Sequence, residues 1–133
     1  MFMDKKLILI ADDDAEIIAS MSHILVSAGY NIIAAKNGKE ALSYIYERKP
    51  DVIILDITMP EMNGFDVLKH LRENPLPDKW QPVIIVSGRD DFASLKKGYE
   101  YEAEHYITKP FDKQTLLKSI EIMLSLVPFR KNI

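Results

Sequence analysis

The sequence predicts an α/β domain built on a doubly wound, five-stranded parallel sheet with five helices. Five short apolar runs lie at residues 7–11, 32–35, 52–55, 83–86 and, more weakly, 105–108. The first four runs do not alternate with polar residues, which is typical of strands buried on both faces of a helix-covered sheet. Segments of helical periodicity separate the runs, and this alternation favours parallel strands joined by right-handed crossovers.

The helices are expected where apolar residues recur at steps of three and four. The first covers residues 15–28, and Gly29 follows it as a stop signal. Asn37 and Asp112 are expected to cap the second and the last helix. The third and fourth are predicted from two apolar sets: Phe65, Val67, Leu68 and Leu71, followed by the breakers Pro75 and Pro77, and Phe92, Leu95 and Tyr99.

Composition limits the function classes. The 133 residues fit one domain, and a net charge of -3 predicts no attraction to nucleic acid or to an anionic membrane surface. The chain has no cysteine, which excludes a disulfide framework and thiolate metal sites. No signal peptide or membrane-spanning run is recognisable, so we expect a cytoplasmic protein.

Polar residues occur where the predicted strands end. Asp12 and Asp13 follow the first strand, and Asp56 ends the third. Ser87 ends the fourth strand and Lys109 follows the fifth. Ligands of such sheets bind at the carboxyl ends of the strands. If the strand order is 2-1-3-4-5, the flavodoxin-like arrangement, the first and third strands are neighbours and the three aspartates meet in one pocket.

Three neighbouring carboxylates repel one another by about 4 kcal/mol per close pair at an effective dielectric of about 20. Either one carboxylate is protonated or a divalent cation offsets the repulsion. A small set of oxygen ligands suits Mg2+. Lys109 would add a cation and Ser87 a hydroxyl at the same site. A metal, a cation and a hydroxyl around one carboxylate indicate phosphoryl transfer, and Asp56 is the best candidate for the nucleophile.

Four motifs in this order resemble the receiver domain of two-component response regulators: ILIADDDAE, DVIILDITMPEMNG, VIIVSG and YITKPF. The resemblance covers residues 5–126, and leaves residues 1–4 as an N-terminal extension and 127–133 as a tail or linker stub. It implies that Asp12, Asp13, Asp56 and the backbone carbonyl of Thr58 hold Mg2+. It also implies that Asp56 accepts a phosphoryl group from a sensor histidine kinase or a histidine phosphotransfer protein.

The resemblance assigns further roles. Ser87 and Lys109 are expected to contact the phosphoryl group, and Ser87 and Tyr106 to form a switch. The switch would alter the output face of the fourth helix, fifth strand and fifth helix. The Lys109–Pro110 bond is expected to be cis. Such a protein is a signalling phosphoacceptor, not an enzyme, and catalyses only its own phosphorylation and dephosphorylation.

Partners and assembly follow from the same resemblance. We expect a monomer, with a weak dimer on phosphorylation as the alternative. A downstream protein partner or a fused output domain is not identified by the sequence. Contacts with nucleic acid or membrane are not expected from this domain. Tyr99, Tyr101 and Tyr106, together with Lys96 and Lys97, form either a partner surface or a scattered set.

Rival functions use some of the same residues. A haloacid-dehalogenase-like phosphatase needs a second aspartate where this chain has Thr58, and no glycine-rich nucleotide loop follows the first strand. The alternative that stays open is a receiver-like interaction module that works without phosphorylation. One departure from the family pattern is Glu102, before Ala103, in place of the usual glycine. Asp14 is interpreted as a helix cap.

Overall fold

The computed structural model describes residues 5–88 and 103–127. Its five strands are β1 (Leu7–Ala11), β2 (Asn31–Ala35), β3 (Val52–Asp56), β4 (Val83–Ser87) and β5 (His105–Thr108). They form one sheet in the order β2-β1-β3-β4-β5, and every neighbouring pair is parallel. The predicted fold class and strand order are therefore confirmed.

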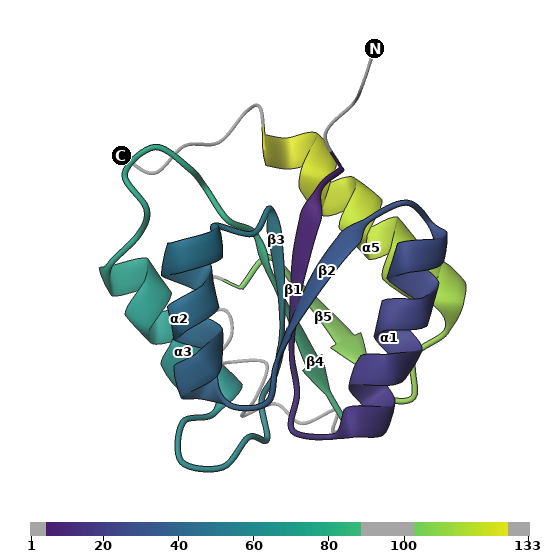
Figure 1. Ribbon diagram of the computed structural model, residues 1–133, viewed down its shortest axis with the longest axis horizontal. Helices are drawn as coiled ribbons and strands as arrows, with labels where there is room; N and C mark the ends of the chain where they lie inside the picture. The colour runs from purple at the N-terminus through teal and green to yellow at the C-terminus, as the bar shows by residue number, and fades with distance from the viewer. Residues whose placement is uncertain (1–4, 89–102, 128–133) are drawn as a thin grey trace.

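Helices cover both faces of the sheet, which gives three layers (Figure 1). The described helices are α1 (Ala15–Ser27), α2 (Gly38–Arg48), α3 (Gly64–Glu73) and α5 (Lys113–Leu126). Figure 1 shows α1 and α5 on one side of the sheet and α2 and α3 on the other. The segment expected to form a fourth helix, with Phe92, Leu95 and Tyr99, lies outside the described residues, as does Glu102.

The core is divided in two by the sheet because successive strand side chains point to opposite faces. Leu9, Ile53 and Ile85 pack on the face covered by α2 and α3, and Ile8, Ile10, Ile54 and Ile84 pack on the face covered by α1 and α5. All of these side chains are at most 1% exposed. This explains why the strands appear in the sequence as unbroken apolar runs.

The expected helix caps are present. Asp14, Asn37 and Asp112 each accept a hydrogen bond from a backbone N–H of the first turn of α1, α2 and α5. These bonds satisfy donors that have no partner within a helix. The helix α1 ends one residue earlier than expected, and Gly29 follows with φ of 98°, a conformation that glycine adopts without strain.

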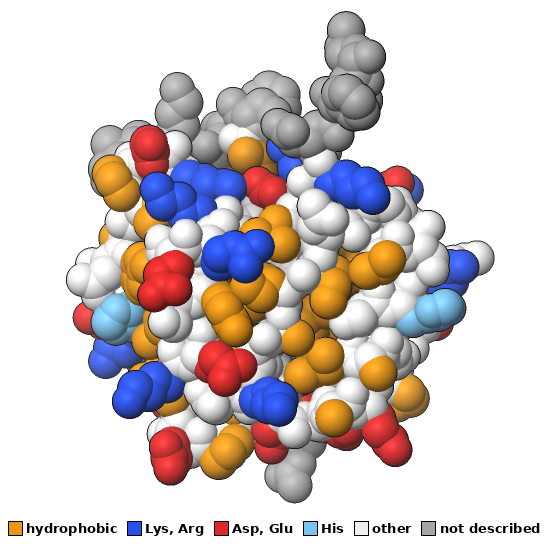
Figure 2. Space-filling model, in the orientation of Figure 1, with side chains coloured by type: hydrophobic (Ala, Val, Ile, Leu, Met, Phe, Trp, Pro, Cys, Tyr) orange, Lys and Arg blue, Asp and Glu red, His pale blue; other side chains and the backbone are white. Residues whose placement is uncertain are grey.

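The surface view shows the face that contains the edge strand β2 (Figure 2). Hydrophobic side chains gather along its middle, and Lys, Arg, Asp and Glu side chains of both signs surround them. No helix within the described ranges is both long enough and apolar enough to cross a membrane.

Candidate functional site

The carboxyl ends of the strands bring the predicted site residues together. Asp56 is the last residue of β3 and Ser87 the last residue of β4, while Asp12 and Lys109 directly follow β1 and β5. Two backbone hydrogen bonds hold the residues beyond the strand ends: Asp12 N–H donates to the Ala35 carbonyl at 3.1 Å, and Lys109 N–H donates to the Ser87 carbonyl at 2.7 Å. The functional side chains therefore start from fixed backbone positions.

Asp12, Asp13 and Asp56 form an acidic cluster. One carboxylate oxygen from each lies within 4.8 Å of the others. Asp12 and Asp56 are each only 2% exposed, whereas Asp13 is exposed to solvent. The cluster thus has a buried side and a side that is open to solvent at Asp13.

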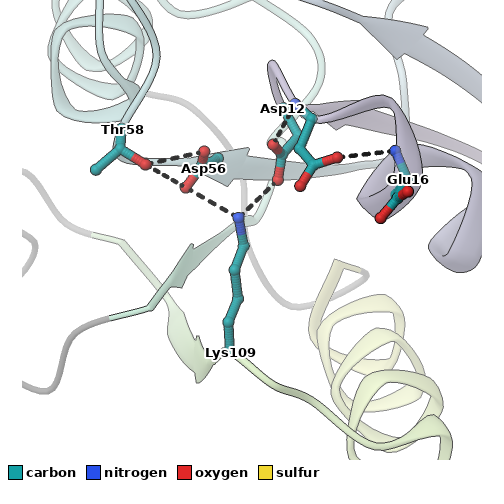
Figure 3. A network of polar contacts seen from close by, with 6 residues as sticks. Asp12, Glu16, Asp56, Thr58 and Lys109 are labelled. Atoms are coloured by element: carbon teal, nitrogen blue, oxygen red, sulfur yellow. Dashed lines mark hydrogen bonds and ion pairs between the residues drawn. The ribbon is translucent and has the colours of Figure 1, made fainter.

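Lys109 reaches into this cluster from the carboxyl end of β5 (Figure 3). Its Nζ lies 2.9 Å from Asp12 Oδ2 and 3.4 Å from Asp56 Oδ1. Burial opposes a charge on Lys109, but the hydrogen bond to Asp12 and the charges of Asp56 and Asp12 outweigh it, so the pKa of Lys109 is raised. Lys109 stays a cation, and one cation is set against three carboxylates. The Lys109–Pro110 peptide bond is cis.

The pKa of Asp56 is raised. Burial is the main cause, and the charge of Asp12 adds to it. Lys109 and hydrogen bonds from Thr58 act in the opposite direction without cancelling the effect. The ionised carboxylate of Asp56 is therefore held at high free energy in a desolvated position. Added positive charge nearby would stabilise the ionised carboxylate, and a reaction that transfers its negative charge to another group would be favoured.

Thr58 contacts the same carboxylate through its side chain. Its hydroxyl lies 3.2 Å from Asp56 Oδ2 and 3.3 Å from Asp56 Oδ1, so it donates to the edge of the carboxylate (Figure 3). The sequence-based role of Thr58 as a metal ligand rested on its carbonyl, and this hydroxyl contact was not predicted. The signal was present, because a Thr two residues beyond a strand-end Asp can fold back onto it.

Asp12 is oriented by the start of α1. Its Oδ1 accepts a hydrogen bond from Asp14 N–H at 2.9 Å, while Asp14 in turn caps α1 through Glu16 N–H at 2.9 Å. Oδ2 of Asp12 is left to face Lys109. The three successive acidic residues therefore differ in role: Asp12 and Asp13 belong to the acidic cluster, and Asp14 caps α1, as predicted from the sequence.

Glycine is required where α3 begins. A Cβ on Gly64 would lie 2.5 Å from the carbonyl oxygen of Asp56 and 3.0 Å from its carbonyl carbon. Asn63 and Asp66 form a capping box that holds the first turn of α3 at this position. The end of β3 and the start of α3 are consequently packed backbone against backbone, a contact that the sequence analysis did not identify.

The two switch candidates occupy neighbouring strands. Ser87 is 6% exposed at the end of β4. Tyr106 lies on β5 opposite Ile85, and its ring is half-buried against the core on the α2 and α3 side. Ser87 lies at the carboxyl ends of the strands, as Asp56 does. Its register partner on β5 is Thr108, and Tyr106 lies two residues before Thr108, further from the site.

The donors present fit a hard divalent cation. Every side chain of the acidic cluster offers an oxygen atom, and Mg2+ prefers oxygen ligands and retains several waters. His23, His70 and His105 are all exposed and lie outside this cluster. Within the described ranges, the acidic cluster is the one group of His, Asp and Glu side chains with a geometry for metal binding.

Comparison with known proteins gives the family. The sequence model of the response regulator receiver domain matches residues 8–121. This chain is a response regulator receiver domain. It is 35% identical over 118 residues to protein PilH of Pseudomonas aeruginosa, a match that covers 89% of this chain and 97% of PilH. Receiver domains act in two-component signalling, where histidine kinases or phosphotransfer proteins are their partners.

Other receiver proteins are longer. The chain is 34% identical over 122 residues to the alkaline phosphatase synthesis transcriptional regulatory protein PhoP of Bacillus subtilis, which covers 92% of this chain and 49% of PhoP. The chain thus spans about half the length of several curated relatives that it matches. Among solved structures, chemotaxis protein CheY4 of Vibrio cholerae has a TM-score of 0.85 and 32% identity, and covers 91% of this receiver domain and 100% of CheY4.

Proposed function

We propose that this receiver domain is a phosphoacceptor and that Asp56 takes the phosphoryl group. The observation that carries the proposal is the convergence of Asp12, Asp13 and Asp56 within 4.8 Å, with Lys109 3.4 Å from Asp56. A buried carboxylate with a raised pKa, a nearby cation and an open side combines a nucleophile with the means to stabilise a transferred anion.

In the proposed reaction, an oxygen of the Asp56 carboxylate attacks the phosphorus of a phosphohistidine. The new P–O bond forms as the P–N bond breaks, and the departing imidazole takes up a proton. Lys109 faces the attacking carboxylate and can follow the transferred phosphoryl group with a charge-assisted hydrogen bond. The hydroxyl of Thr58 contacts both carboxylate oxygens of Asp56. When one oxygen becomes bonded to phosphorus, the hydroxyl must leave that oxygen but can keep its contact with the other.

The proposed cofactor is Mg2+. Asp12, Asp13, Asp56 and the backbone carbonyl of Thr58 would hold it, and Asp12 Oδ1 is already oriented by Asp14 N–H. When bound, Mg2+ supplies the positive charge that phosphoryl transfer requires. The fold holds the carboxylate oxygens of the three aspartates close together although they repel one another. The site is therefore preorganised for a cation.

We further propose that Ser87 and Tyr106 transmit the phosphorylated state. The hydroxyl of Ser87 would donate to a phosphoryl oxygen, and Tyr106 would turn further inward on β5. The phosphoryl group must favour this arrangement over the outward one, since a ligand shifts an equilibrium only by its difference in affinity. A shift from 1:99 to 99:1 needs about 5.5 kcal/mol of such difference. The readout face would comprise the predicted fourth helix, β5 and α5.

The remaining assignments are proposals of the same kind. Residues 5–126 would form the receiver domain, acting as a monomer in the cytoplasm with a weak dimer on phosphorylation as the alternative. Its phosphodonor would be a sensor histidine kinase or a histidine phosphotransfer protein. The output, through a separate partner or a fused domain, is not specified by the site.

The test is incubation with Mg2+ and acetyl phosphate or phosphoramidate, followed by intact mass measurement. We expect one added phosphoryl group in the wild type and none with Asp56→Asn or with EDTA. A receiver-like interaction module that works without phosphorylation would show no labelling in the wild type. Labelling that survives both Asp56→Asn and EDTA would overturn the assignment of the site.

A further inference from the structure

Gly38, the first residue of α2, touches the loop that connects β3 to α3. A Cβ built on Gly38 would lie 2.5 Å from the backbone oxygen of Met62, 2.8 Å from its Cβ and 2.8 Å from its Cγ. Real Cβ atoms essentially never approach other atoms so closely. Two of these three neighbours belong to the part of Met62 that cannot rotate away, so an added methyl group must displace the backbone of one partner.

The displaced partner would be the loop, because α2 is fixed. Asn37 caps the helix through Glu40 N–H at 2.8 Å, and Ala41 and Ile45 are fully buried in the core on this side of the sheet. Moving Gly38 would move these buried side chains, which a close-packed core resists. The loop has exposed residues on its outer side and can yield.

The loop carries Met62 and Thr58 within one tight structure. Met62 N–H donates to the carbonyl of Pro60 at 2.7 Å, and Glu61 between them has φ of 67°, in the left-handed region. Met59, next to Thr58, is 5% exposed and belongs to the core. A displacement of Met62 is therefore passed on to Thr58 through the three residues between them, which these contacts hold together.

Thr58 is the residue by which this loop meets the acidic cluster. Its hydroxyl lies 3.2 Å from Asp56 Oδ2, and its carbonyl is the proposed fourth ligand of Mg2+. We infer that Gly38 is a positioning residue for the cation site: the absence of a side chain there sets how close the loop, and with it Thr58, lies to Asp56. This inference rests on the proposed function, and Gly38 itself touches neither the cation nor the phosphoryl group.

The test compares Gly38→Ala with Gly29→Ala. Both add one methyl group, at the start of α2 and just after α1, but a Cβ on Gly29 meets no atom within 4 Å, and its φ of 98° makes the substitution strained. Gly29→Ala thus controls for loss of stability without contact to the loop. Mg2+ affinity is measured by titration calorimetry. Amide resonances of residues 57–59, 61 and 62 are recorded by NMR without metal, so one readout is independent of the cation.

We expect Gly38→Ala to shift the loop resonances and to weaken Mg2+ binding by about tenfold or more, the range found when residues that support metal ligands are changed. Gly29→Ala should leave both unchanged. In the double variant Gly38→Ala/Met62→Gly, two of the three close neighbours are removed, and Mg2+ affinity should recover in part. The double variant should also fold if Gly38→Ala alone does not.

Three results would overturn the inference: loop resonances and Mg2+ affinity of Gly38→Ala equal to those of the wild type, a double variant that recovers neither folding nor affinity, or an equal loss in Gly29→Ala. Failure of the proposed function has a different signature, since the wild type itself would then bind no Mg2+. Shifted loop resonances in Gly38→Ala without metal would still support the contact in that case.

Discussion

Lys109 and Asp12, which are separated by 97 residues in the chain, are joined by a hydrogen bond of 2.9 Å between Nζ and Oδ2. The contact connects the end of β5 to the end of β1 across β3 and β4, and Asp56 lies within 3.4 Å of the same Nζ. One lysine therefore partly neutralises two buried carboxylates and links the acidic cluster to the strand that carries Tyr106.

Lys109→Met is expected to slow phosphorylation by small phosphodonors. The variant keeps a side chain of similar length but removes the cation that would follow the transferred phosphoryl group. Loss of one such electrostatic contact commonly lowers a rate by about 100-fold or more. The measurement is the initial rate of mass gain with acetyl phosphate at saturating Mg2+. Lys113→Met, which removes the same charge from an exposed position at the start of α5, is the matched control and should retain the wild-type rate.

Asp56→Asn is expected to raise the free energy of unfolding of the metal-free protein. Asp56 is 2% exposed and is one of three neighbouring carboxylates that one lysine cannot fully offset. Removing a charge from such a strained site commonly stabilises a protein by about 0.5–2 kcal/mol. Urea unfolding followed by the fluorescence of Trp80, which is 7% exposed, measures the change. Asp14→Asn, which keeps a capping side chain outside the cluster, should have little effect, and a less stable Asp56→Asn would contradict the account of the site.

Arg72 on α3 and Glu104 before β5 form a largely buried ion pair. Arg72 Nη2 lies 2.8 Å from Glu104 Oε2, which also accepts a hydrogen bond from Val83 N–H at 2.9 Å. Arg72→Met would leave the carboxylate of Glu104 without this cation and is expected to destabilise the fold by about 3 kcal/mol. Glu104→Gln in the same chain removes the charge but retains an acceptor for Val83, so the double variant should recover most of the loss. Equal stabilities of the single and double variants in urea would show that the charge is not the cause.

Asp112 is expected to make the stability of α5 depend on pH. The carboxylate of Asp112 accepts hydrogen bonds in the first turn of α5, mainly from Thr115, and these bonds lower the pKa of Asp112 in the folded protein. A lowered folded pKa gives a stabilisation that is present above the unfolded pKa and is lost as pH falls through the folded pKa. Wild type should therefore have a higher Tm than Asp112→Asn near neutral pH, and the difference should vanish in acid. A difference that persists at about pH 2 would contradict this origin.

Local patterns predicted the parts of the fold that depend on local chemistry. Buried strands appear as apolar runs because both faces are covered, and Asn37 and Asp112 were identified because caps need short side chains with an oxygen acceptor. The meeting of Asp12 with Asp56 followed from parallel strands that share one carboxyl edge. For the described residues, strand order and the acidic cluster could thus be predicted together.

Long-range contacts away from the carboxyl ends of the strands were not predictable from the sequence. The pairing of Arg72 with Glu104 joins residues 32 positions apart and has no local signature. The close approach of Gly64 to Asp56, and of Gly38 to Met62, depends on how helices pack beside the sheet. Glycines at the start of helices resemble ordinary turn residues until the neighbouring atoms are known. Tyr99, Tyr101 and Glu102, for which expectations were drawn from the sequence, lie outside the described residues.

The most direct test of the central claim is to locate the phosphoryl group after labelling with acetyl phosphate and Mg2+. The protein is digested, and peptides are mapped with and without hydroxylamine, which cleaves an acyl phosphate but spares the phosphate esters of Ser and Thr. We predict one hydroxylamine-sensitive phosphoryl group on the peptide that contains Asp56. A hydroxylamine-resistant group on Thr58 or Ser87, or an acyl phosphate on Asp12 or Asp13, would contradict the assignment of Asp56 as the phosphoacceptor.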